Sequence, residues 1–525
     1  MLVHPALFLL GGIAASYLPV GVWKKRLGLA SGFLCLITVL FRPETYIFRV
    51  QYLNFELKFL EVAAINRPYA VIFALLGLLS LMYSYIYAGP RLYRRFLFYL
   101  ISVIMLVHAG DLLTFYLSWE LMSLSAFFLI SYGFDRRARR AGVYYFLMHV
   151  SGGLSLLFGV ILQYQAAGTL ELQLISHGEP FFIYAILVKL AALGMHFWLP
   201  RAYTTAPFTA CVFLASITTK AGVYALYRLL GINLIAYIGL FMAMGGVVLA
   251  LRQDRTRRLL SYSIISQVGY MVAGISYGTT TSILGGNIHV INHILYKALL
   301  FMVAGVIIDV TDGRENLARM GRSLGKKIPL TAVSGVIASL AIAGIPPFNG
   351  YVSKMVIKSG IDSSLLEYGL LLTGVGTALC FLKFCYYGFF ARSSEEIKLK
   401  KSVPLLSRIA LIATSALVII LGVSFSGYEV FLGTEELFPA VYSPAYLVEG
   451  LIPPLLAVFI FVLKPEIISP HITHEVKLYD PYIIGFNRFR ALTTRVSSVH
   501  DGRIPRYIHW IITGVILYMA LILLL

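Results

Sequence analysis

Charged residues are scarce in this 525-residue chain, and acidic residues are the scarcest. Only 13% of the residues are charged while 59% are hydrophobic, and 24 Asp and Glu stand against 43 Lys and Arg. Soluble globular domains carry about 25% charged residues. This shortage excludes a water-soluble globular protein and indicates a chain that lies in a membrane.

Cysteine is also scarce. The four cysteines are Cys35, Cys211, Cys380 and Cys385, and no two of them have CxxC spacing. Iron–sulfur and structural zinc sites need such clustered thiolates. No nucleophile–base pair or cluster of metal ligands stands out either. We therefore expect no redox centre, metal or cofactor in this chain, and a membrane enzyme is the least favoured class of function.

Long apolar runs, in contrast, recur along the whole chain. A helix needs about 20 mostly apolar residues to cross the hydrocarbon core of a membrane. The sequence contains sixteen such runs, which predicts an all-α polytopic membrane protein with about 16 transmembrane helices. The runs are 2–22, 27–41, 69–87, 93–109, 111–133, 141–166, 181–199, 208–230, 232–251, 258–277, 283–308, 328–361, 366–390, 404–424, 447–464 and 506–525. We expect the first to be a retained anchor, because basic residues follow it and none precedes it.

The basic residues are spread over alternate loops, which excludes a nucleic-acid-binding domain. Loops that follow odd-numbered runs hold 32 of the 43 Lys and Arg, whereas loops after even-numbered runs are nearly uncharged or acidic. Basic loops stay on the cytoplasmic side of a membrane. The chain is therefore predicted to lie in the cell (inner) membrane with the odd loops in the cytoplasm and both termini on the outer side.

Five lysines and one glutamate stand out inside the apolar runs. They are Glu120, Lys189, Lys220, Lys297, Lys354 and Lys383. A charge at mid-bilayer costs about 2.5–3.5 kcal/mol, so such residues usually face a protein interior or a water-filled path. We predict that these groups take part in ion translocation.

Glu120 is too deep in its run for its side chain to reach water. Lys189 and Lys220 are equally central, and opposite charges about 4 Å apart attract by about 4 kcal/mol at an effective dielectric of 20. This arrangement predicts an ion pair between Glu120 and a lysine, with a purely structural pair as the alternative. Lys383 lies near the end of its run, where a lysine that extends to the membrane interface is equally expected.

A stripe of titratable side chains runs along 283–308. His289, His293 and Lys297 follow one another at intervals of four residues, so they share one face of a helix. Histidines change charge near neutral pH, and the stripe is predicted to relay protons. A histidine satisfied within the core is the alternative for His289. Four others are expected to be structural or interfacial: His4, His108, His149 and His196.

Prolines interrupt two runs beside their buried lysines. Pro200 and Pro207 follow the lysine of run 181–199, and Pro346 with Pro347 precede that of run 328–361. Transporters place ion sites at broken helices, often in the two halves of an inverted repeat. Runs 4–8 and 9–13 are predicted to form two inverted five-helix repeats, each with its broken helix fourth. The expected divisions are 1–90, 91–230 and 231–392 for the N-terminal helices and the two repeats, 393–464 for two further helices and 465–525 for the C-terminal segment.

Two segments outside the repeats have patterns of their own. Residues 48–59 alternate apolar and polar side chains around Leu53 and Asn54, which predicts an external β-hairpin. Residues 465–506 mix apolar and basic side chains. This mixture favours an interfacial amphipathic helix on the cytoplasmic side that contacts a neighbouring subunit, with a plain loop as the alternative.

Six stretches carry a resemblance to a known family. In chain order they are WELMSL around Glu120, KLAALGMHFWLPRAYTTAP, TKAGVYALYRL, RQDRTRRLLSYSIISQVGYM, HVINHILYKALLFMVAG and GIPPFNGYVSK. Over about residues 90–390 the chain resembles the antiporter-like subunits of respiratory complex I, of Mrp-type cation/proton antiporters and of membrane-bound nickel–iron hydrogenases. The resemblance implies fourteen core helices, inverted repeats of five with broken seventh and twelfth helices, and a polar axis at mid-membrane.

The resemblance also implies a role for each buried group. It places Glu120 and Lys189 in the charge pair of the first half-channel, Lys220 at the connection, His289, His293 and Lys297 in the second half, and Lys354 at the exit. Lys383 matches no motif of the family. The C-terminal linker of about forty residues is shorter than the lateral helix of the largest complex I subunit, and its length fits contact with one neighbour.

Together these features predict a proton- or cation-translocating subunit of a multi-subunit membrane complex of complex I-like, hydrogenase-like or Mrp type. The expected partners are other membrane subunits, including further antiporter-like subunits, with H⁺ or Na⁺ and the lipid bilayer. The hypothesis is that a partner breaks the Glu120–Lys189 pair and drives a proton along Lys220 and His293 towards Lys354. A self-sufficient Na⁺/H⁺ antiporter and a structural assembly subunit are the alternatives.

Overall fold

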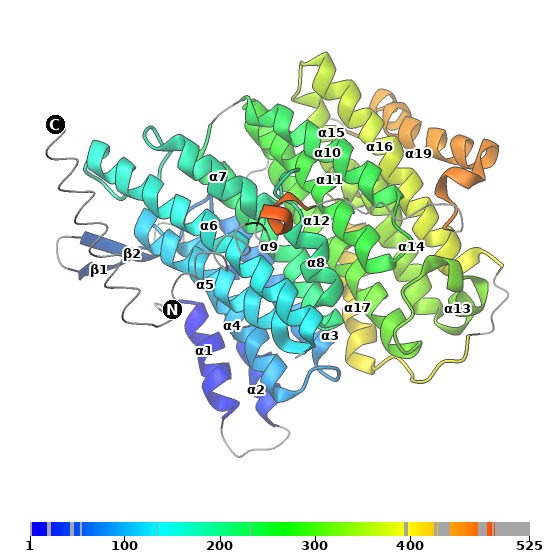
Figure 1. Ribbon diagram of the computed structural model, residues 1–525, viewed down its shortest axis with the longest axis horizontal. Helices are drawn as coiled ribbons and strands as arrows, with labels where there is room; N and C mark the ends of the chain where they lie inside the picture. Colours follow the sequence, from blue (N-terminus) through cyan, green and yellow to red (C-terminus); the bar gives the residue numbers. More distant parts are fainter. Residues whose placement is uncertain are drawn as a thin grey trace, which may run out of the picture. The chain divides into compact units, whose positions relative to one another are not determined.

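The computed structural model describes most of the chain, namely residues 3–17, 23–42, 47–52, 55–133, 135–231, 233–392, 397–424, 428, 441–470, 480–485 and 488. The chain forms two compact units, Met1–Glu475 and Val476–Leu525. The helices and strands labelled in Figure 1 belong to the first unit. The predicted run 506–525 and most of the predicted amphipathic segment 465–506 lie outside the described residues.

Helices dominate the described residues, and each of the first fifteen predicted runs overlaps at least one helix. In chain order they are α1 (Ala6–Ala15), α2 (Trp23–Leu40), α3 (Arg67–Ser84), α4 (Pro90–His108), α5 (Leu112–Ile130), α6 (Arg136–Ala167), α7 (Glu179–Leu190), α8 (Trp198–Thr205), α9 (Phe208–Leu229), α10 (Ile235–Leu251), α11 (Thr256–Tyr277), α12 (Thr280–Val310), α13 (Arg322–Lys327), α14 (Pro329–Ala343), α15 (Asn349–Ser359), α16 (Ser364–Cys385), α17 (Leu405–Val423) and α19 (Pro444–Leu463).

Many of these helices can cross a membrane. Within the described ranges, nine are long and apolar enough by length and composition: α3, α5, α6, α9, α11, α12, α16, α17 and α19. The helices α1, α10 and α14 are apolar but shorter. This arrangement confirms the predicted class of an all-α polytopic membrane protein.

The core of the molecule is formed by α9, α11 and α12, which lie in the middle of Figure 1. The most apolar stretches of α9 and α11 are completely buried, and α12 contacts α9, α11, α14 and α15. At the contact between α10 and α11 the backbones approach so closely that a Cβ at Gly269 would overlap Ala243. The peripheral helices α6 and α19 instead expose apolar side chains such as Leu154 and Phe459, as expected of a surface that faces lipid.

The first predicted helix break is present, but Pro200 does not lie in it. Helix α7 ends at Leu190, and Ala191 adopts a left-handed φ of 57°. The chain is then not helical until α8 begins at Trp198. Pro200 lies in the first turn of α8, where the missing N–H group costs little, and Pro207 separates α8 from α9. The proline therefore follows the break, which comes directly after Lys189.

The second predicted break lies where the prolines are. Helix α14 ends at Ala343, and Gly344 adopts a left-handed φ of 80°. Pro346 and Pro347 occupy the connection to α15 and are joined by a cis peptide bond. Lys354 is in the middle of α15, one turn after the break. Each broken helix thus has a buried lysine beside its non-helical segment.

The predicted β-hairpin is also present. Strands β1 (Ile47–Tyr52) and β2 (Phe55–Glu61) pair antiparallel, with Tyr52 opposite Phe55, and the predicted turn residues lie outside the described ranges. The backbone N–H of Lys58 donates to Asp111, which caps the start of α5, and the Lys58 ammonium group donates to Glu171. The hairpin is therefore fastened to the end of the bundle where α5 begins.

Candidate functional site

Lys189 lies fully buried in the last turn of α7. Its Nζ donates a 2.8 Å hydrogen bond to Ser123 Oγ of α5 and lies 4.3 Å from the centre of the Trp119 ring. Ser123 and Trp119 come from adjacent turns of α5, so they share one helix face. The ammonium group is thus held by a neutral hydroxyl and by the face of an aromatic ring.

Glu120 does not form the predicted ion pair. Its Oε1 is buried with no hydrogen-bond partner among the described residues, and no described ion pair involves it. The carboxyl group lies against Gly153 of α6, where a Cβ would overlap Oε1. The predicted direct Glu120–Lys189 pair is therefore wrong in this structure, because the lysine bonds to Ser123 instead. The two groups remain near enough to interact electrostatically.

Lys220 and Lys297 are the next two buried lysines along the chain. They lie on the central helices α9 and α12, and both are fully buried. Lys220 Nζ donates a 2.7 Å hydrogen bond to the carbonyl oxygen of Ala215 in its own helix. Lys297 Nζ donates a 2.6 Å hydrogen bond to Ser263 Oγ of α11 and lies 5.5 Å from the centre of the Phe381 ring. As at Lys189, the partners are neutral oxygens.

The histidines of the α12 stripe differ in their surroundings. His289 Nδ1 lies 2.8 Å from Ser353 Oγ of α15, and its Nε2 lies 3.5 Å from the Tyr296 hydroxyl. Neither ring nitrogen of His293 has a hydrogen-bond partner in the described part of the chain. The His293 ring centre is 6.4 Å from that of His289. His293 therefore offers two polar atoms to a mobile donor or acceptor such as water.

Lys354 ends the line on α15. Its Nζ donates a 2.7 Å hydrogen bond to the carbonyl oxygen of Ile342, the last-but-one residue of α14, and lies 5.1 Å from the centre of the Tyr270 ring. The carbonyl is one that the end of a helix leaves without an intrahelical partner. The break between α14 and α15 thus supplies the oxygen that binds this lysine.

A cavity of about 40 Å³ extends from Lys354 to a cluster of charges. Its lining also includes Tyr270, Lys358 and Glu367. Lys358 Nζ lies 3.2 Å from Glu367 Oε1 of α16 and is also paired with Glu449 of α19. The volume suffices for water, which needs at least about 10–15 Å³. The cavity, whose lining is otherwise mostly apolar, therefore joins Lys354 to a partly exposed lysine that two carboxylates hold.

Lys383 reaches the connection between α10 and α11. Its side chain is fully buried, and Nζ lies 2.9 Å from Asp254 Oδ1 and 3.0 Å from the carbonyl oxygen of Leu251. Asp254 lies in the connection between α10 and α11. Lys383 differs from the other buried lysines in having a carboxylate partner, and that partner lies in a connection predicted to be cytoplasmic, so the interfacial alternative stays a prediction.

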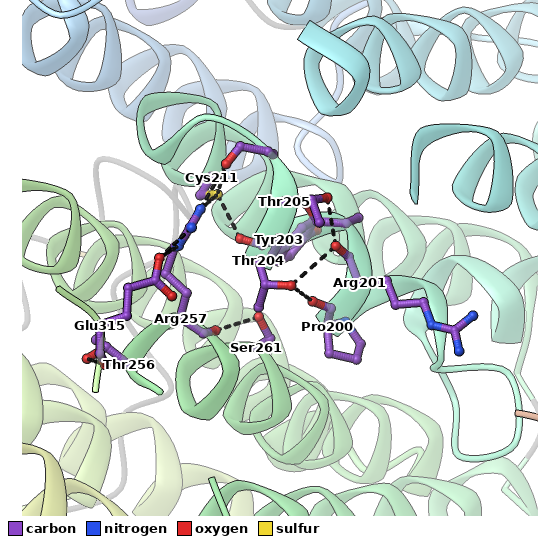
Figure 2. A network of polar contacts seen from close by, with 12 residues as sticks. Pro200, Arg201, Tyr203, Thr204, Thr205, Cys211, Thr256, Arg257, Ser261 and Glu315 are labelled. Atoms are coloured by element: carbon purple, nitrogen blue, oxygen red, sulfur yellow. Dashed lines mark hydrogen bonds and ion pairs between the residues drawn. The ribbon is translucent and has the colours of Figure 1, made fainter. Parts of the chain in front are cut away.

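Figure 2 shows a polar network where α8 meets α9 and α11. Arg257 donates to the carbonyl oxygen of Ala206 at 2.8 Å and to Glu315 Oε1 at 2.6 Å, and Cys211 Sγ lies 3.9 Å from the same guanidinium group. The backbone N–H of Thr256 donates to the carbonyl oxygen of Glu315. One arginine thus ties the end of the first broken helix to α11 and to the loop after α12.

The remaining sequence-predicted histidines have local partners. His108 Nδ1 lies 2.8 Å from the carbonyl oxygen of Ile104, His149 Nδ1 lies 2.9 Å from that of Tyr145, and His4 lies near the His108 ring. These contacts fit the predicted structural role. Among the described residues, no group of three or more His, Cys, Asp or Glu could hold a metal ion.

Lys189, Lys220, Lys297 and Lys354 lie on helices of which each contacts the next. Helix α7 contacts α9, α9 contacts α12, and α12 contacts α15. The sequence analysis missed the side chains that bind the buried lysines and His289, namely Ser123, Ser263, Ser353 and Asp254. A buried serine in an apolar run has no signal that distinguishes it from serines bonded to their own helix, such as Ser31.

Comparison with known proteins gives a family match. Residues 109–380 match the family described as "NADH:quinone oxidoreductase/Mrp antiporter, TM". NADH-quinone oxidoreductase subunit N of Desulforudis audaxviator is 30% identical, over 55% of this chain and 64% of that protein. A Na(+)/H(+) antiporter subunit of Alkalihalophilus pseudofirmus is 28% identical, over 65% of this chain and 74% of that protein. The chain spans about half the length of an antiporter subunit mnhA2 of Staphylococcus epidermidis, to which it is 30% identical.

Two solved structures share the fold. A chain of the Mrp complex from Dietzia sp. DQ12-45-1b superimposes with a TM-score of 0.80 at 22% identity, over 99% of this chain and 63% of that one. A chain of the membrane-bound sulfane sulfur reductase, an archaeal respiratory membrane complex, gives a TM-score of 0.77 at 22% identity, over 98% and 99% of the two chains. These similarities confirm the antiporter-like fold, and the relatives are subunits of multi-subunit membrane complexes.

Proposed function

The chain belongs to the NADH:quinone oxidoreductase/Mrp antiporter transmembrane family, and from this premise we propose that it moves protons or sodium ions through a larger membrane complex. The complex is of Mrp, complex I-like or hydrogenase-like type. Its other membrane subunits include further antiporter-like chains. The chain lies in the cell membrane with both termini on the outer side, an orientation supported by the alternation of basic loops.

The observation that carries the proposal is a line of buried lysines with neutral partners. Lys189, Lys220, Lys297 and Lys354 each donate to a hydroxyl or a backbone carbonyl. A purely structural lysine is expected to pair with a carboxylate, as Lys383 does with Asp254. A charge held by neutral oxygens can pass along the line without any ion pair having to separate.

The proposed path follows the helix contacts. A proton enters near Glu120 and Lys189, passes to Lys220 and reaches α12 at His293, whose ring nitrogens have no partner among the described residues. Lys297 lies one turn from His293 on the same helix face. The proton continues past His289 and Ser353 on facing helices to Lys354. The cavity beside Lys354 and the Lys358 cluster form the exit.

The energy for transport comes from partner subunits. Moving one charge against 100 mV costs about 2.3 kcal/mol, and the sequence contains no motif for a redox cofactor. A partner can act on the path by moving the Glu120 carboxyl group relative to Lys189, since the two interact without a direct bond. We further propose that α4–α9 and α10–α16 are inverted repeats, each with its broken helix beside a buried lysine.

The test uses the intact complex in sealed vesicles with a pH-sensitive dye. Lys354→Ala and Glu120→Gln should each lower the initial rate of translocation at least about tenfold, equivalent to about 1.4 kcal/mol. Arg136→Gln, an exposed change at the start of α6, should leave the rate unchanged. Normal rates in both site variants would refute the proposal.

Assembly must be measured on the same membranes. If the complex fails to assemble in the charge variants, the alternative of a structural subunit is favoured. If the purified single chain exchanges Na⁺ for H⁺ in liposomes, the alternative of a self-sufficient antiporter is favoured. We expect neither result.

A further inference from the structure

A second cavity, of about 300 Å³, lies where α14 and α17 begin. Three basic residues, Lys327, Lys401 and Arg408, line it, and none of its lining residues is acidic. No step of the ion path uses this cavity. Its charge and position therefore call for another explanation.

The basic side chains of the lining have different surroundings. Lys401 Nζ lies 3.1 Å from Asp309 Oδ1 at the end of α12. Lys327 Nζ donates a 2.6 Å hydrogen bond to the carbonyl oxygen of Ile397. Arg408 is exposed, and no ion pair within the described part of the chain involves it. The guanidinium group of Arg408 is therefore available to a ligand in the cavity.

The two helix ends add to this positive potential. The first turn of α14, residues Pro329–Thr331, lines the cavity, and α17 begins at Leu405, two residues after the lining residue Val403. The first N–H groups of a helix have no intrahelical partner and favour an anion. The cavity therefore combines charged side chains with the positive ends of two helices.

Apart from Thr331 and Ser402, the rest of the lining is apolar. Ile328, Leu330, Leu399 and Val403 stand beside the basic residues, and both helices are among the apolar helices of the bundle. A free phosphate ion gains nothing from such a surface, whereas the glycerol and first acyl carbons of a lipid do. In the predicted topology the loops 314–327 and 392–408 are cytoplasmic, the side on which basic pockets between helices bind anionic headgroups.

We propose that this cavity binds the phosphate group of an anionic phospholipid, with Lys327, Lys401 and Arg408 around the phosphate and the apolar lining against the glycerol. The site is independent of the proposed ion translocation. The bound lipid would hold the loop 397–404 against the start of α14.

The test is a binding titration of the full-length chain purified in neutral detergent. The probes are dioctanoyl phosphatidylglycerol, dioctanoyl phosphatidylcholine and inorganic phosphate, each followed by the shift in unfolding temperature. The triple variant Lys327→Gln/Lys401→Gln/Arg408→Gln should bind the anionic lipid at least about tenfold more weakly, because it loses three of the charges that attract the headgroup. The single variant Arg408→Gln, at an exposed position, should weaken binding by a few-fold and tests the site if the triple variant does not fold.

The matched control removes three exposed charges elsewhere, in Arg136→Gln/Arg137→Gln/Arg139→Gln at the start of α6. It should bind the anionic lipid as the natural chain does. Equal weakening in this control and in the pocket variants would overturn the proposal. So would binding of phosphatidylcholine as tight as that of phosphatidylglycerol. Inorganic phosphate that protects the chain as strongly as the anionic lipid would overturn the lipid as the ligand.

Discussion

Lys189 donates its hydrogen bond to Ser123, and not to Glu120, although all three side chains belong to the same two helices. The serine lies one turn from the glutamate on α5. Removing the hydroxyl leaves a buried ammonium group with only the Trp119 ring as its partner. The hydrogen bond to Ser123 therefore fixes the position of the Lys189 ammonium group.

The first prediction concerns this hydroxyl. Ser123→Ala should destabilise the chain by about 1–3 kcal/mol, the usual cost of a buried donor without a partner, and should slow translocation. Ser123→Thr keeps the hydroxyl and should restore both. Ser31→Ala, which removes a buried hydroxyl bonded to the carbonyl oxygen of Gly28 in its own helix, is the matched control for stability. Translocation at the normal rate in Ser123→Ala would show that the lysine does not depend on Ser123.

The second prediction concerns the space that Glu120 occupies. Gly153→Ala would place a Cβ on the Glu120 carboxyl group, so the carboxyl must move, whereas Gly152→Ala meets Val188 only at an ordinary 3.5 Å contact. Because the displaced atoms end a flexible side chain, Gly153→Ala should still fold. We expect a several-fold change in translocation for Gly153→Ala and none for Gly152→Ala, measured per assembled complex. Equal rates would argue against a role for the position of Glu120.

The positions of the buried charges could be predicted from sequence, whereas their partners could not. Lys189, Lys220, Lys297 and Lys354 stand out because a charge in an apolar run is costly wherever the helix packs. The Ser123 contact depends instead on how α5 and α7 are rotated against each other, which an apolar pattern does not specify. Glu120 faces Gly153 for the same reason: the pocket exists only when α5 and α6 are packed.

The same limit explains the error at Pro200 and the missed partner of Lys383. Proline marks a helix boundary but is also favoured in the first turn of a helix, so Pro200 indicated a nearby break without placing it. For Lys383 the apolar pattern indicated its depth along α16 but could not show that the α10–α11 connection brings Asp254 to it.

The third prediction separates Lys383 from the ion path. Asp254→Ala removes the carboxylate and leaves a buried cation, which should cost about 3–5 kcal/mol. The double variant Asp254→Leu/Lys383→Met removes both charges and should recover much of that stability. Thermal unfolding measures the stability of the single and the double variant. Translocation by the assembled double variant should be normal. Loss of translocation in a stable double variant would place Lys383 in the path.

The fourth prediction is a pH dependence outside the membrane. A hydrogen bond from Lys58, together with its charge, lowers the pKa of Glu171 from the ordinary value of 4.5. A lowered carboxyl pKa stabilises the folded state above the unfolded pKa, and this stabilisation disappears as the pH falls through the folded pKa. Glu171→Gln should therefore lower the unfolding temperature slightly near pH 7 and have no effect well below pH 4.5. The effect is small because the carboxylate is 61% exposed. Lys58→Gln should produce the same pattern. A difference in unfolding temperature from the natural chain that persists in acid would contradict the stabilising Lys58–Glu171 interaction.

The fifth prediction concerns the exit cavity. Lys358 holds Glu367 and Glu449 together, so Lys358→Met would leave two neighbouring carboxylates that repel each other and attract cations. In the chain with Lys354→Cys, a cationic thiol reagent should then reach the new cysteine several-fold faster than when Lys358 is present, because the cavity joins the two positions. Lys358→Met without Lys354→Cys measures labelling of the native cysteines, and Lys326→Met is the control for loss of an exposed charge elsewhere. An unchanged labelling rate would mean that the Lys358 cluster does not control access to Lys354 and that the exit lies in another direction.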